Sequence, residues 1–411
     1  MLRLKYFWIL FLCSAVRGQE RNLEYYFQHA KGSSPLLADY RNQMQAASVD
    51  SQILKATQKI QVNGISLNSY APVINGYGYD MVITNGAQVS AYVQASKNII
   101  TAADLATRYE TIRLMKSSIG NTALLVEKDI RKTITSQYVT VYGDYQTLLF
   151  GREILTSFRR EDSLLKRLTQ AGIYKQTDYL TFYVSLQQQQ LQVRQSEIQF
   201  RNDCAILNYL SGIVDTSLVS LAAPNLQLRA MPDIMNSPFY RQYTLDSLNL
   251  VNQQKTILYT YKPKLNIYAD AGYNSSLQYE PYKNFGMSAG LNFSVPIYDG
   301  KQRNMKYQKI NIAEDTRQHY KDYFLRQYTQ QIAQLSQQLQ ATESLIDDIN
   351  GQIKYSSTLI AVNKKLLETG EVRITDMILT INTYLNARNL LNQNYVNRMQ
   401  IINQINYWQA L

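Results

Sequence analysis

The chain has few of the residues that most catalytic and metal-binding sites require. Its 411 residues include two cysteines, two histidines and eight prolines. His29 and His319 lie far apart, and neither has a carboxylate or a cysteine nearby at a spacing typical of metal ligands. There is also no Ser-His-Asp order, no phosphate-cradling loop and no convincing pair of acids. We therefore expect no enzyme activity, no catalytic residue, no metal and no cofactor.

Long apolar runs are scarce as well. The apolar run at residues 6–13 is too short to span a bilayer, and no later run approaches the ~18–20 residues that a transmembrane helix needs. That short run follows a basic start and precedes a small-residue cleavage site, so residues 1–18 are predicted to be a secretory signal peptide. Cys13 leaves a lipoprotein signal as the alternative, which the bulky Leu12 in front of it disfavours.

The charge is modest and is not gathered into blocks. The formal net charge of +11 is made of singly scattered residues, which gives no support for nucleic-acid binding. In an exported chain cut after residue 18, Cys204 would be the only cysteine left, so no internal disulfide is possible. Its place within a helical pattern favours burial as a small apolar side chain over a reactive thiol.

One stretch of sequence occurs twice, 198 positions apart. Residues 168–178 align with 366–376, and the same offset pairs Asn-Tyr-Leu at 208–210 with Asn-Tyr-Trp at 406–408. A constant offset without gaps indicates a duplicated structural unit.

Each copy contains Gly-x4-Thr-Asp between two long polar helical patterns, which predicts a helical hairpin. We expect the glycine to end the first helix in a left-handed conformation, the threonine to cap the second helix, and the aspartate to lie at its positive end. These residues are Gly172, Thr177 and Asp178 in the first copy, and Gly370, Thr375 and Asp376 in the second.

Four short segments alternate apolar with polar or small residues. The clearest are residues 265–273 and 287–297. In the first copy the alternation is weaker, with these apolar positions: Ile65, Leu67, Ala71 and Val73, then Val89, Ala91, Val93 and Ala95. One such segment would fit a half-exposed sheet of a soluble domain. Four of them in two hairpins of a helical chain favour membrane strands, with one face in lipid and the other in water. The predicted lipid-facing side chains are Leu291, Phe293 and Val295.

The helical patterns are long. Residues 101–170 and 301–368 each predict a helix of about 105 Å. Shorter helices are expected before each strand hairpin (residues 35–60 and 238–261) and after each Gly-x4-Thr-Asp turn (residues 178–211 and 376–408). Helices this polar need lateral partners, as in a wall of antiparallel coiled coils.

The fold class is therefore mainly α with a small β part and an internal two-fold repeat. The first repeat is assigned to residues 19–211, with its strand hairpin at about 62–98. The second is assigned to 238–411, with its hairpin at about 264–298, and residues 212–237 connect the two.

Glutamine-rich stretches at residues 187–190 and 327–340 allow three interpretations. They predict a wet, uncharged tunnel lining or hydrogen bonds between helices, and a solvated helix face remains an equal alternative.

Several short motifs follow one another along the chain: Ser237-Pro238, Lys262-Pro263-Lys264-Leu265, Val295-Pro296-Ile297-Tyr298-Asp299-Gly300-Lys301-Gln302-Arg303, Glu368-Thr369-Gly370 with Thr375-Asp376, and Ile378, Leu379, Leu385 and Ala387. With these motifs in this order and spacing, the chain after the signal resembles the TolC family of outer-membrane efflux channels. Asn98 stands in the first hairpin where the second has Pro296, so the first hairpin is the more diverged.

The resemblance implies a homotrimer in the outer membrane of a Gram-negative cell. Each chain would give four strands to a shared 12-stranded transmembrane β-barrel and its helices to an α-barrel that extends into the periplasm. The tips, with Gly172, Thr177, Asp178, Gly370, Thr375 and Asp376, would meet a periplasmic adaptor (membrane fusion protein) and an inner-membrane pump.

Asp178 and Asp376 would be pore-constriction residues at the entrance, and Asp376 would belong to an acidic ring that favours cations. The alternative, compatible with the first, is that both aspartates only stabilise the starts of helices. Leu379 stands where the family has a second acid, so a second acidic ring and strong cation selectivity are not expected.

The implied function is a passive exit duct of a tripartite efflux pump for small molecules. The exit channel of a type I protein secretion system and a non-transport periplasmic coiled-coil structural protein are the alternatives. Cargo, pump, gating and lipidation of the N-terminus remain open.

Overall fold

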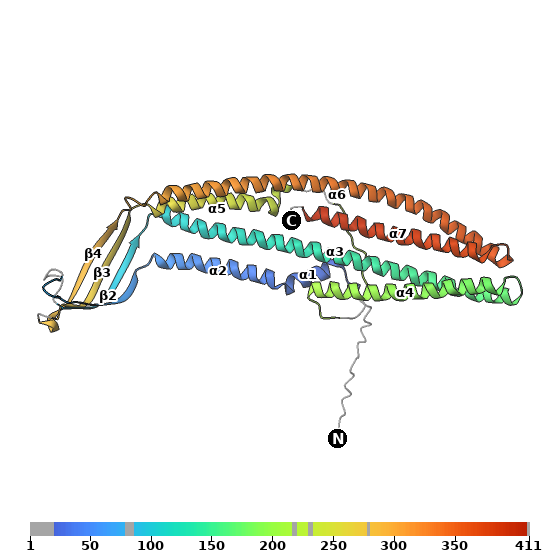
Figure 1. The fold of residues 1–411 in the computed structure, drawn as a ribbon, viewed down its shortest axis with the longest axis horizontal. Helices are drawn as coiled ribbons and strands as arrows, with labels where there is room; N and C mark the ends of the chain where they lie inside the picture. The colour runs from blue at the N-terminus through green and yellow to red at the C-terminus, as the bar shows by residue number, and fades with distance from the viewer. Residues whose placement is uncertain (1–19, 79–85, 216–219, 229–232, 278–279, 409–411) are drawn as a thin grey trace, which may run out of the picture. The chain divides into compact units, whose positions relative to one another are not determined.

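The computed structural model describes residues 20–78, 86–215, 220–228, 233–277 and 280–408. The predicted signal peptide at residues 1–18 lies outside them. The first half of the chain forms α1 (Leu23–Ser33), α2 (Pro35–Thr57), β1 (Gln61–Ala71), β2 (Gly86–Ile99), α3 (Ala102–Gln170) and α4 (Gln176–Ser211). The second half forms η1 (Ile234–Asn236), α5 (Pro238–Thr260), β3 (Lys264–Ser275), η2 (Pro281–Lys283), β4 (Phe285–Ser294), α6 (Gln302–Thr369) and α7 (Ile374–Tyr407) (Figure 1).

The two halves carry matching elements in the same order. Helices α2 and α5 both have 23 residues, α3 and α6 have 69 and 68, and α4 and α7 have 36 and 34. The predicted mainly helical fold with four strands is thereby confirmed. No helix among the described residues combines the length and the apolar character needed to cross a bilayer.

Helix α1 has no counterpart among the predicted elements. It begins after Asn22, whose side chain accepts a hydrogen bond from the backbone nitrogen of Tyr25, and it ends at Ser34 in an extended conformation. Because the residue before a proline avoids the helical region, Pro35 separates α1 from α2.

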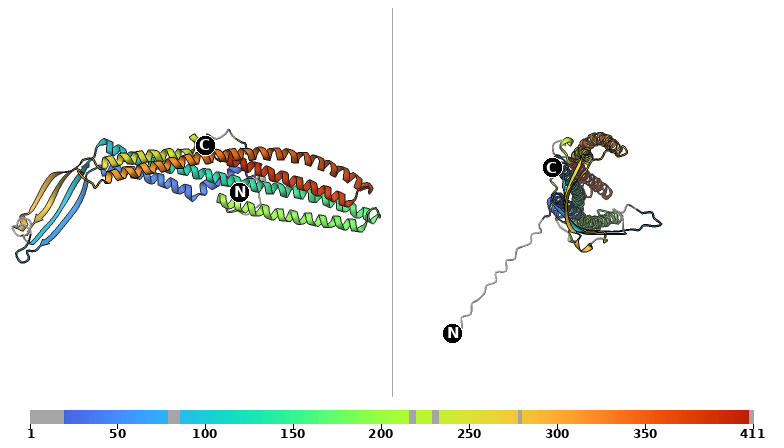
Figure 2. Two further views of the ribbon diagram at one scale, coloured as in Figure 1. Left: turned by 45° about the horizontal axis from the view of Figure 1, so that its top comes forward. Right: turned by 90° about the vertical axis from the view of Figure 1, so that its left-hand side faces the viewer.

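The four strands form one antiparallel sheet in the order β1-β2-β3-β4 (Figure 2). Residues directly opposite each other on neighbouring strands share a face of the sheet. The register sets Val93, Ala271 and Met287 in one row, and Ile99, Leu265 and Phe293 in another. This face of β2, β3 and β4 is apolar apart from Lys97 and Ser275. The opposite face carries asparagine, serine, glycine and tyrosine, with Asp270 as its one acid on β3 and β4.

Strand β1 departs from this pattern. Ile65 pairs with Tyr92 and Leu67 pairs with Ser90, whereas Val93 pairs with Gly64. The alternating apolar residues expected in the first hairpin therefore lie on opposite faces of the sheet and do not form one apolar surface. A shift of one residue in register reverses every side chain of a strand, which the alternation of a single strand cannot reveal.

The chain divides into two compact units, and α3 and α6 each contribute to both. One unit holds the sheet and comprises residues 38–124 and 238–325. The other is helical and comprises residues 1–37, 125–237 and 326–411. The core of the helical unit is made of buried aliphatic and aromatic side chains, among them Phe158 and Phe182, whose rings stack at 5.3 Å.

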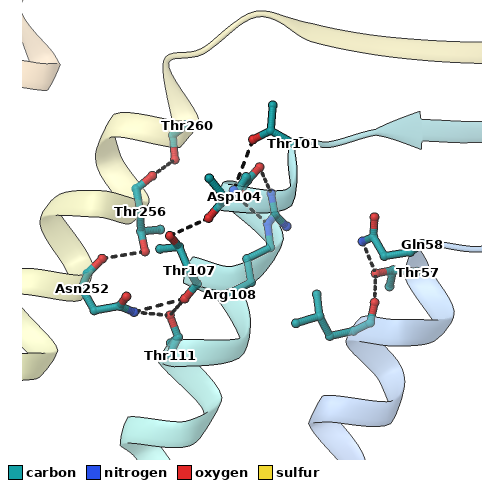
Figure 3. Close-up of polar contacts among 12 residues, drawn as sticks. Thr57, Gln58, Thr101, Asp104, Thr107, Arg108, Thr111, Asn252, Thr256 and Thr260 are labelled. Carbon is teal, nitrogen blue, oxygen red and sulfur yellow. Dashed lines mark hydrogen bonds and ion pairs between the residues drawn. The ribbon is translucent and has the colours of Figure 1, made fainter.

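Much of the packing between helices is polar. In the sheet-bearing unit, the side-chain amide of Asn252 donates to the carbonyl oxygen of Thr107 and, at 2.7 Å, to the hydroxyl of Thr111 (Figure 3). In the helical unit, amides of α7 donate to carbonyl oxygens of α3: Asn392 to Gly143 at 2.7 Å, Gln400 to Ser136 at 2.8 Å and Asn403 to Lys132 at 2.9 Å. These three bonds form an amide ladder between α3 and α7.

Two glycines of α3 allow its neighbours to come close. A Cβ atom on Gly143 would lie 2.4 Å from Cγ2 of Val396, so only glycine fits at this crossing with α7. At Gly151, the side chain of Gln189 from α4 donates to the backbone carbonyl oxygen. Gln189 belongs to the glutamine run at 187–190, and its contact is a hydrogen bond between helices, one of the three interpretations given for that run.

Candidate functional site: helical tips and sheet edges

The two Gly-x4-Thr-Asp turns adopt the same conformation. Gly172 has φ +78° and Gly370 has φ +79°, as expected for a left-handed helix end. After α3, the nitrogen of Gly172 bonds to the carbonyl oxygen of Thr169, and that of Ile173 bonds to Leu168. The same pair of bonds follows α6, from Gly370 and from Glu371. Both turns are therefore complete Schellman motifs.

The expectation that Thr177 and Thr375 cap the second helices is wrong. Helix α4 already begins at Gln176 and α7 at Ile374, so each threonine is the second helical residue. The extended residue that precedes each helix is Lys175 or Arg373, and neither makes a side-chain cap. The cap side chain has to sit on that extended residue, and threonine occurs two positions too late.

The aspartates lie in the first helical turn, as predicted. The backbone nitrogen of Asp376 donates to the carbonyl oxygen of Arg373, and its carboxylate accepts from the Arg373 guanidinium at 2.9 and 3.3 Å. This ion pair is largely exposed, and it neutralises the charge of Asp376 within its own chain. Lys175 occupies the position of Arg373 beside Asp178 in the first tip.

The two tips contact each other. The hydroxyl of Tyr174, in the first tip, lies 3.2 Å from the carbonyl oxygen of Leu367 and 3.0 Å from that of Val372, both in the second. Ile173 packs over Gly370, where a Cβ atom would lie 2.8 Å from its Cγ2. Leu367 and Val372 are buried beneath this contact. We call the two hydrogen bonds of Tyr174 and the packing of Ile173 over Gly370 the tip clasp. Its tyrosine was not singled out from the sequence.

The sheet exposes an apolar surface. Leu291 and Phe293 are 69% and 66% exposed on the apolar face of β4, and Val295 follows just after the strand ends. Strand β3 has 12 residues and β4 has 10, close to the ~9–11 residues of a tilted membrane strand. Strands β1 and β4 are the two edges of the described sheet.

Helices α4 and α6 also expose apolar stripes. On α4 these are Leu180, Val184, Leu191 and Ile198, at intervals of four and seven residues. On α6 they are Tyr355, Leu359 and Val362, at intervals of four and three. Stripes with this spacing are typical of helices that pack against a further helix.

Two carboxylates face each other inside the helical unit. Burial, followed by the hydrogen bond and charge of Asp203, raises the pKa of Asp144 to about 7. Asp203 also accepts from the side-chain amides of Gln137 and Gln199. The neighbouring Cys204 is half-buried, and burial together with the two acids raises its pKa to about 12. Cys204 is thus a packed thiol, as predicted.

Nothing in the described part of the chain gathers three or more histidine, cysteine or acidic side chains into a metal site. A hollow of about 700 Å³ in the helical unit is lined mainly by charged and amide side chains, among them Lys132, whose ammonium group lies over the ring of Tyr407.

Long antiparallel helices joined twice to a four-stranded sheet define the fold of the TolC-family outer-membrane channels. No protein-family model and no curated protein sequence matches this chain. Solved structures do match it, over nearly its whole length.

The similar structures are bacterial channel proteins. CusC, whose conformational changes accompany folding and transmembrane channel formation, matches with a TM-score of 0.76 and 12% identity, over 96% of this chain and 93% of CusC. The outer membrane protein VceC of Vibrio cholerae matches with a TM-score of 0.72 and 11% identity, over 94% and 96%. The open state of the MtrE outer membrane channel of Neisseria gonorrhoeae matches with a TM-score of 0.71 and 10% identity, over 94% and 88%. At these identities the likeness is one of fold.

Proposed function

We propose that this protein is an outer-membrane exit duct, a passive channel that assembles from identical chains. The observation that carries the proposal is the sheet itself. Strands β2, β3 and β4 have one apolar and one polar face, and the outer strands β1 and β4 leave the edges of the sheet unpaired among the described residues. An exposed apolar face of this length fits a bilayer, and a polar face fits a water-filled lumen.

The edges of the sheet require further copies. A sheet edge in lipid leaves backbone groups without partners, at a cost of several kcal/mol each, so the strands have to close into a barrel. Because β1 and β4 are different strands, the contact between copies is head-to-tail, and such contacts form a ring when the rotation between copies closes. The exposed stripes of α4 and α6 likewise lie on two different helices and would meet in the same ring. The family resemblance implies three copies, and therefore a barrel of 12 strands.

The helical tips would form the periplasmic entrance. Gly172, Thr177, Asp178, Gly370, Thr375 and Asp376 lie together at one end of the helical unit, and the tip clasp holds the two turns in one arrangement. We assign contact with the adaptor and the inner-membrane pump to this end. Asp178 and Asp376 remain the constriction candidates, although Arg373 offsets the charge of Asp376 and so weakens any preference for cations.

Energy for transport would come from the pump, because the chain offers no nucleotide-binding motif. Among the alternatives, a periplasmic structural protein explains neither the apolar face of the sheet nor its open edges. A duct for small molecules and one for a secreted protein share this architecture, and they differ in what accumulates when the duct is lost.

Two measurements test the proposal. The purified protein should migrate as a trimer in detergent and conduct ions in a planar bilayer, and a water-soluble monomer that conducts nothing would refute it. A deletion strain should then retain dyes or antibiotics if the cargo is small molecules. One protein missing from the medium, with unchanged drug sensitivity, would instead favour the secretion duct.

A further inference from the structure

All four connections between the strands and helices α2, α3, α5 and α6 lie at one end of the sheet. In the antiparallel order, β1 and β3 begin where β2 and β4 end. Helices α2 and α5 lead into the sheet at this end, and α3 and α6 lead out of it (Figure 1).

Positive charge gathers at this end. Six exposed side chains lie within a few residues of the strand ends, and we call them the basic collar: Lys59, Lys97, Lys262, Lys264, Lys301 and Arg303. None of the six forms an ion pair with another described residue.

The two acids nearby are already engaged. The carboxylate of Asp104 pairs with Arg108 at 3.0 Å (Figure 3). That of Asp299 accepts from the backbone nitrogen of Arg303 at 2.7 Å and so caps the start of α6. Asp104 is thus neutralised by a residue outside the collar, and the carboxylate of Asp299 offsets at most one of the six positive charges.

The other end of the sheet is different. Its described charged residues, Glu280 and Lys283, pair with each other at 2.9 Å. Between the two ends, Asp270 is the one charged residue on β3 and β4. Unpaired positive charge is thus confined to the helix end of the sheet.

Tyrosine rings accompany the collar. Lys262 Nζ lies 4.5 Å from the ring centre of Tyr259, and the Arg303 guanidinium lies 5.8 Å from that of Tyr261. Lys306 Nζ lies 3.3 Å from the hydroxyl of Tyr261. Stacked rings orient cations without neutralising them, and tyrosine with lysine and arginine is typical of the level of lipid headgroups.

Lys97 shows where the apolar surface ends. It lies on the apolar face, in the row of Ile267 and Leu291, one row before Ile99, Leu265 and Phe293. A lysine at the border of an apolar band extends its ammonium group to the membrane surface.

We propose that the basic collar binds the phosphates of anionic phospholipids in the leaflet that faces the helices. The inference rests on the proposed function, since it needs the apolar face to lie in a bilayer. Lysine and arginine clusters next to membrane segments gain about 1 kcal/mol per residue from anionic lipid, which at 25 °C is about fivefold in binding.

The experiment uses the full-length protein, reconstituted into vesicles of phosphatidylcholine with one fifth phosphatidylglycerol. The protein is extracted in mild detergent, and its bound lipids are quantified by mass spectrometry. The collar variant carries Lys262→Gln, Lys264→Gln, Lys301→Gln and Arg303→Gln. The matched control removes four exposed cations of the helical unit, by Arg159→Gln, Arg160→Gln, Lys166→Gln and Arg194→Gln. A third variant replaces Lys262, Lys264 and Lys301 by arginine and keeps the charge.

We expect about fivefold enrichment of phosphatidylglycerol on the wild type, the helical-unit control and the arginine variant, and clearly less on the collar variant, which keeps only Lys59 and Lys97. The inference is overturned if an inserted wild type shows no enrichment, or if the collar variant retains it, or if the helical-unit control loses it as well. A wild-type protein that does not insert into these vesicles overturns the proposed function and this inference with it. Insertion without enrichment overturns the inference alone.

Discussion

The hydroxyl of Tyr174 lies 3.0 Å from the carbonyl oxygen of Val372, the residue at the equivalent position of the second repeat, 198 residues further on. Two turns of the same conformation thus meet at equivalent positions, one of which contributes a side-chain hydroxyl and the other a backbone carbonyl oxygen. Because the acceptor belongs to the backbone, only the donor side of this contact depends on the identity of a side chain.

The tip clasp can be weakened by Tyr174→Phe. Loss of the hydroxyl leaves two carbonyl oxygens without this donor, at about 1 kcal/mol. We expect faster hydrogen exchange in residues 168–180 and 366–378, and more frequent opening in single-channel recordings. Tyr183→Phe, on helix α4 after the turn, is the control and should change neither. Equal exchange in both variants would mean that the clasp does not hold the tips together.

The two faces of the sheet can be compared with one substitution on each. Leu291→Arg places a charge on the apolar face, which costs about 2–4 kcal/mol in a membrane strand, so assembly in the membrane should be lost. Asn292→Arg, its neighbour on the polar face, should assemble normally. The readout is the fraction of protein in the outer-membrane fraction that migrates as an oligomer. Normal assembly of both variants would argue against a lipid-facing sheet.

The Asp144–Asp203 pair predicts a pH dependence of stability. Because the folded-state pKa of Asp144 is raised to about 7 from its ordinary 3.8, the folded protein holds a proton that the unfolded chain releases. The stabilisation is therefore complete below pH ~4 and is lost as the pH rises through about 7.

Between pH 5 and pH 8.5 the free energy of unfolding should fall by about 1–2 kcal/mol, less than the full shift in pKa would give because solvent screens this half-buried group. Asp144→Asn should flatten this decline, since the amide keeps the shape and cannot ionise. Asp376→Asn, at the exposed tip, is the control and should leave the decline in place. The measurement is thermal unfolding followed by circular dichroism across that pH range.

The crossing of α3 and α7 predicts a rescue. Gly143→Ala forces a methyl group against Val396 and should destabilise the protein by about 1–3 kcal/mol. Adding Val396→Ala should restore most of the loss. Gly351→Ala, in a helix position with open space, should instead stabilise by roughly 0.5–1 kcal/mol. The measurement is the denaturation midpoint of the wild type, the two single glycine variants and the double variant. Destabilisation by Gly351→Ala would mean that lack of space does not explain the effect at Gly143.

The long elements could be predicted because their signals are local. Helix α3, predicted at residues 101–170, is observed at Ala102–Gln170, and the left-handed glycines at 172 and 370 follow from the repeated turn alone. The end of β4 was predicted less well, because the strand stops at Ser294 and does not continue to residue 297. Pro296 has no backbone N–H to donate to a neighbouring strand.

Contacts between distant segments escaped prediction for a different reason. The register that separates Ile65 from Val93 depends on the pairing of two strands, and the partner of Tyr174 depends on how two turns pack. The sequence analysis did not single out Asn392, Gln400 and Asn403, although amide side chains recurring along one long helix could have indicated bonds to a neighbouring helix.

The amide ladder has a consequence for movement. Helices packed through leucine side chains expose apolar surface to water when they separate, which is unfavourable. Where side-chain amides of α7 donate to carbonyl oxygens of α3, water can replace these hydrogen bonds on separation. The α3 carbonyl oxygens can still accept hydrogen bonds from their own helix. This contact between α3 and α7 can therefore separate and form again without exposing a large apolar surface.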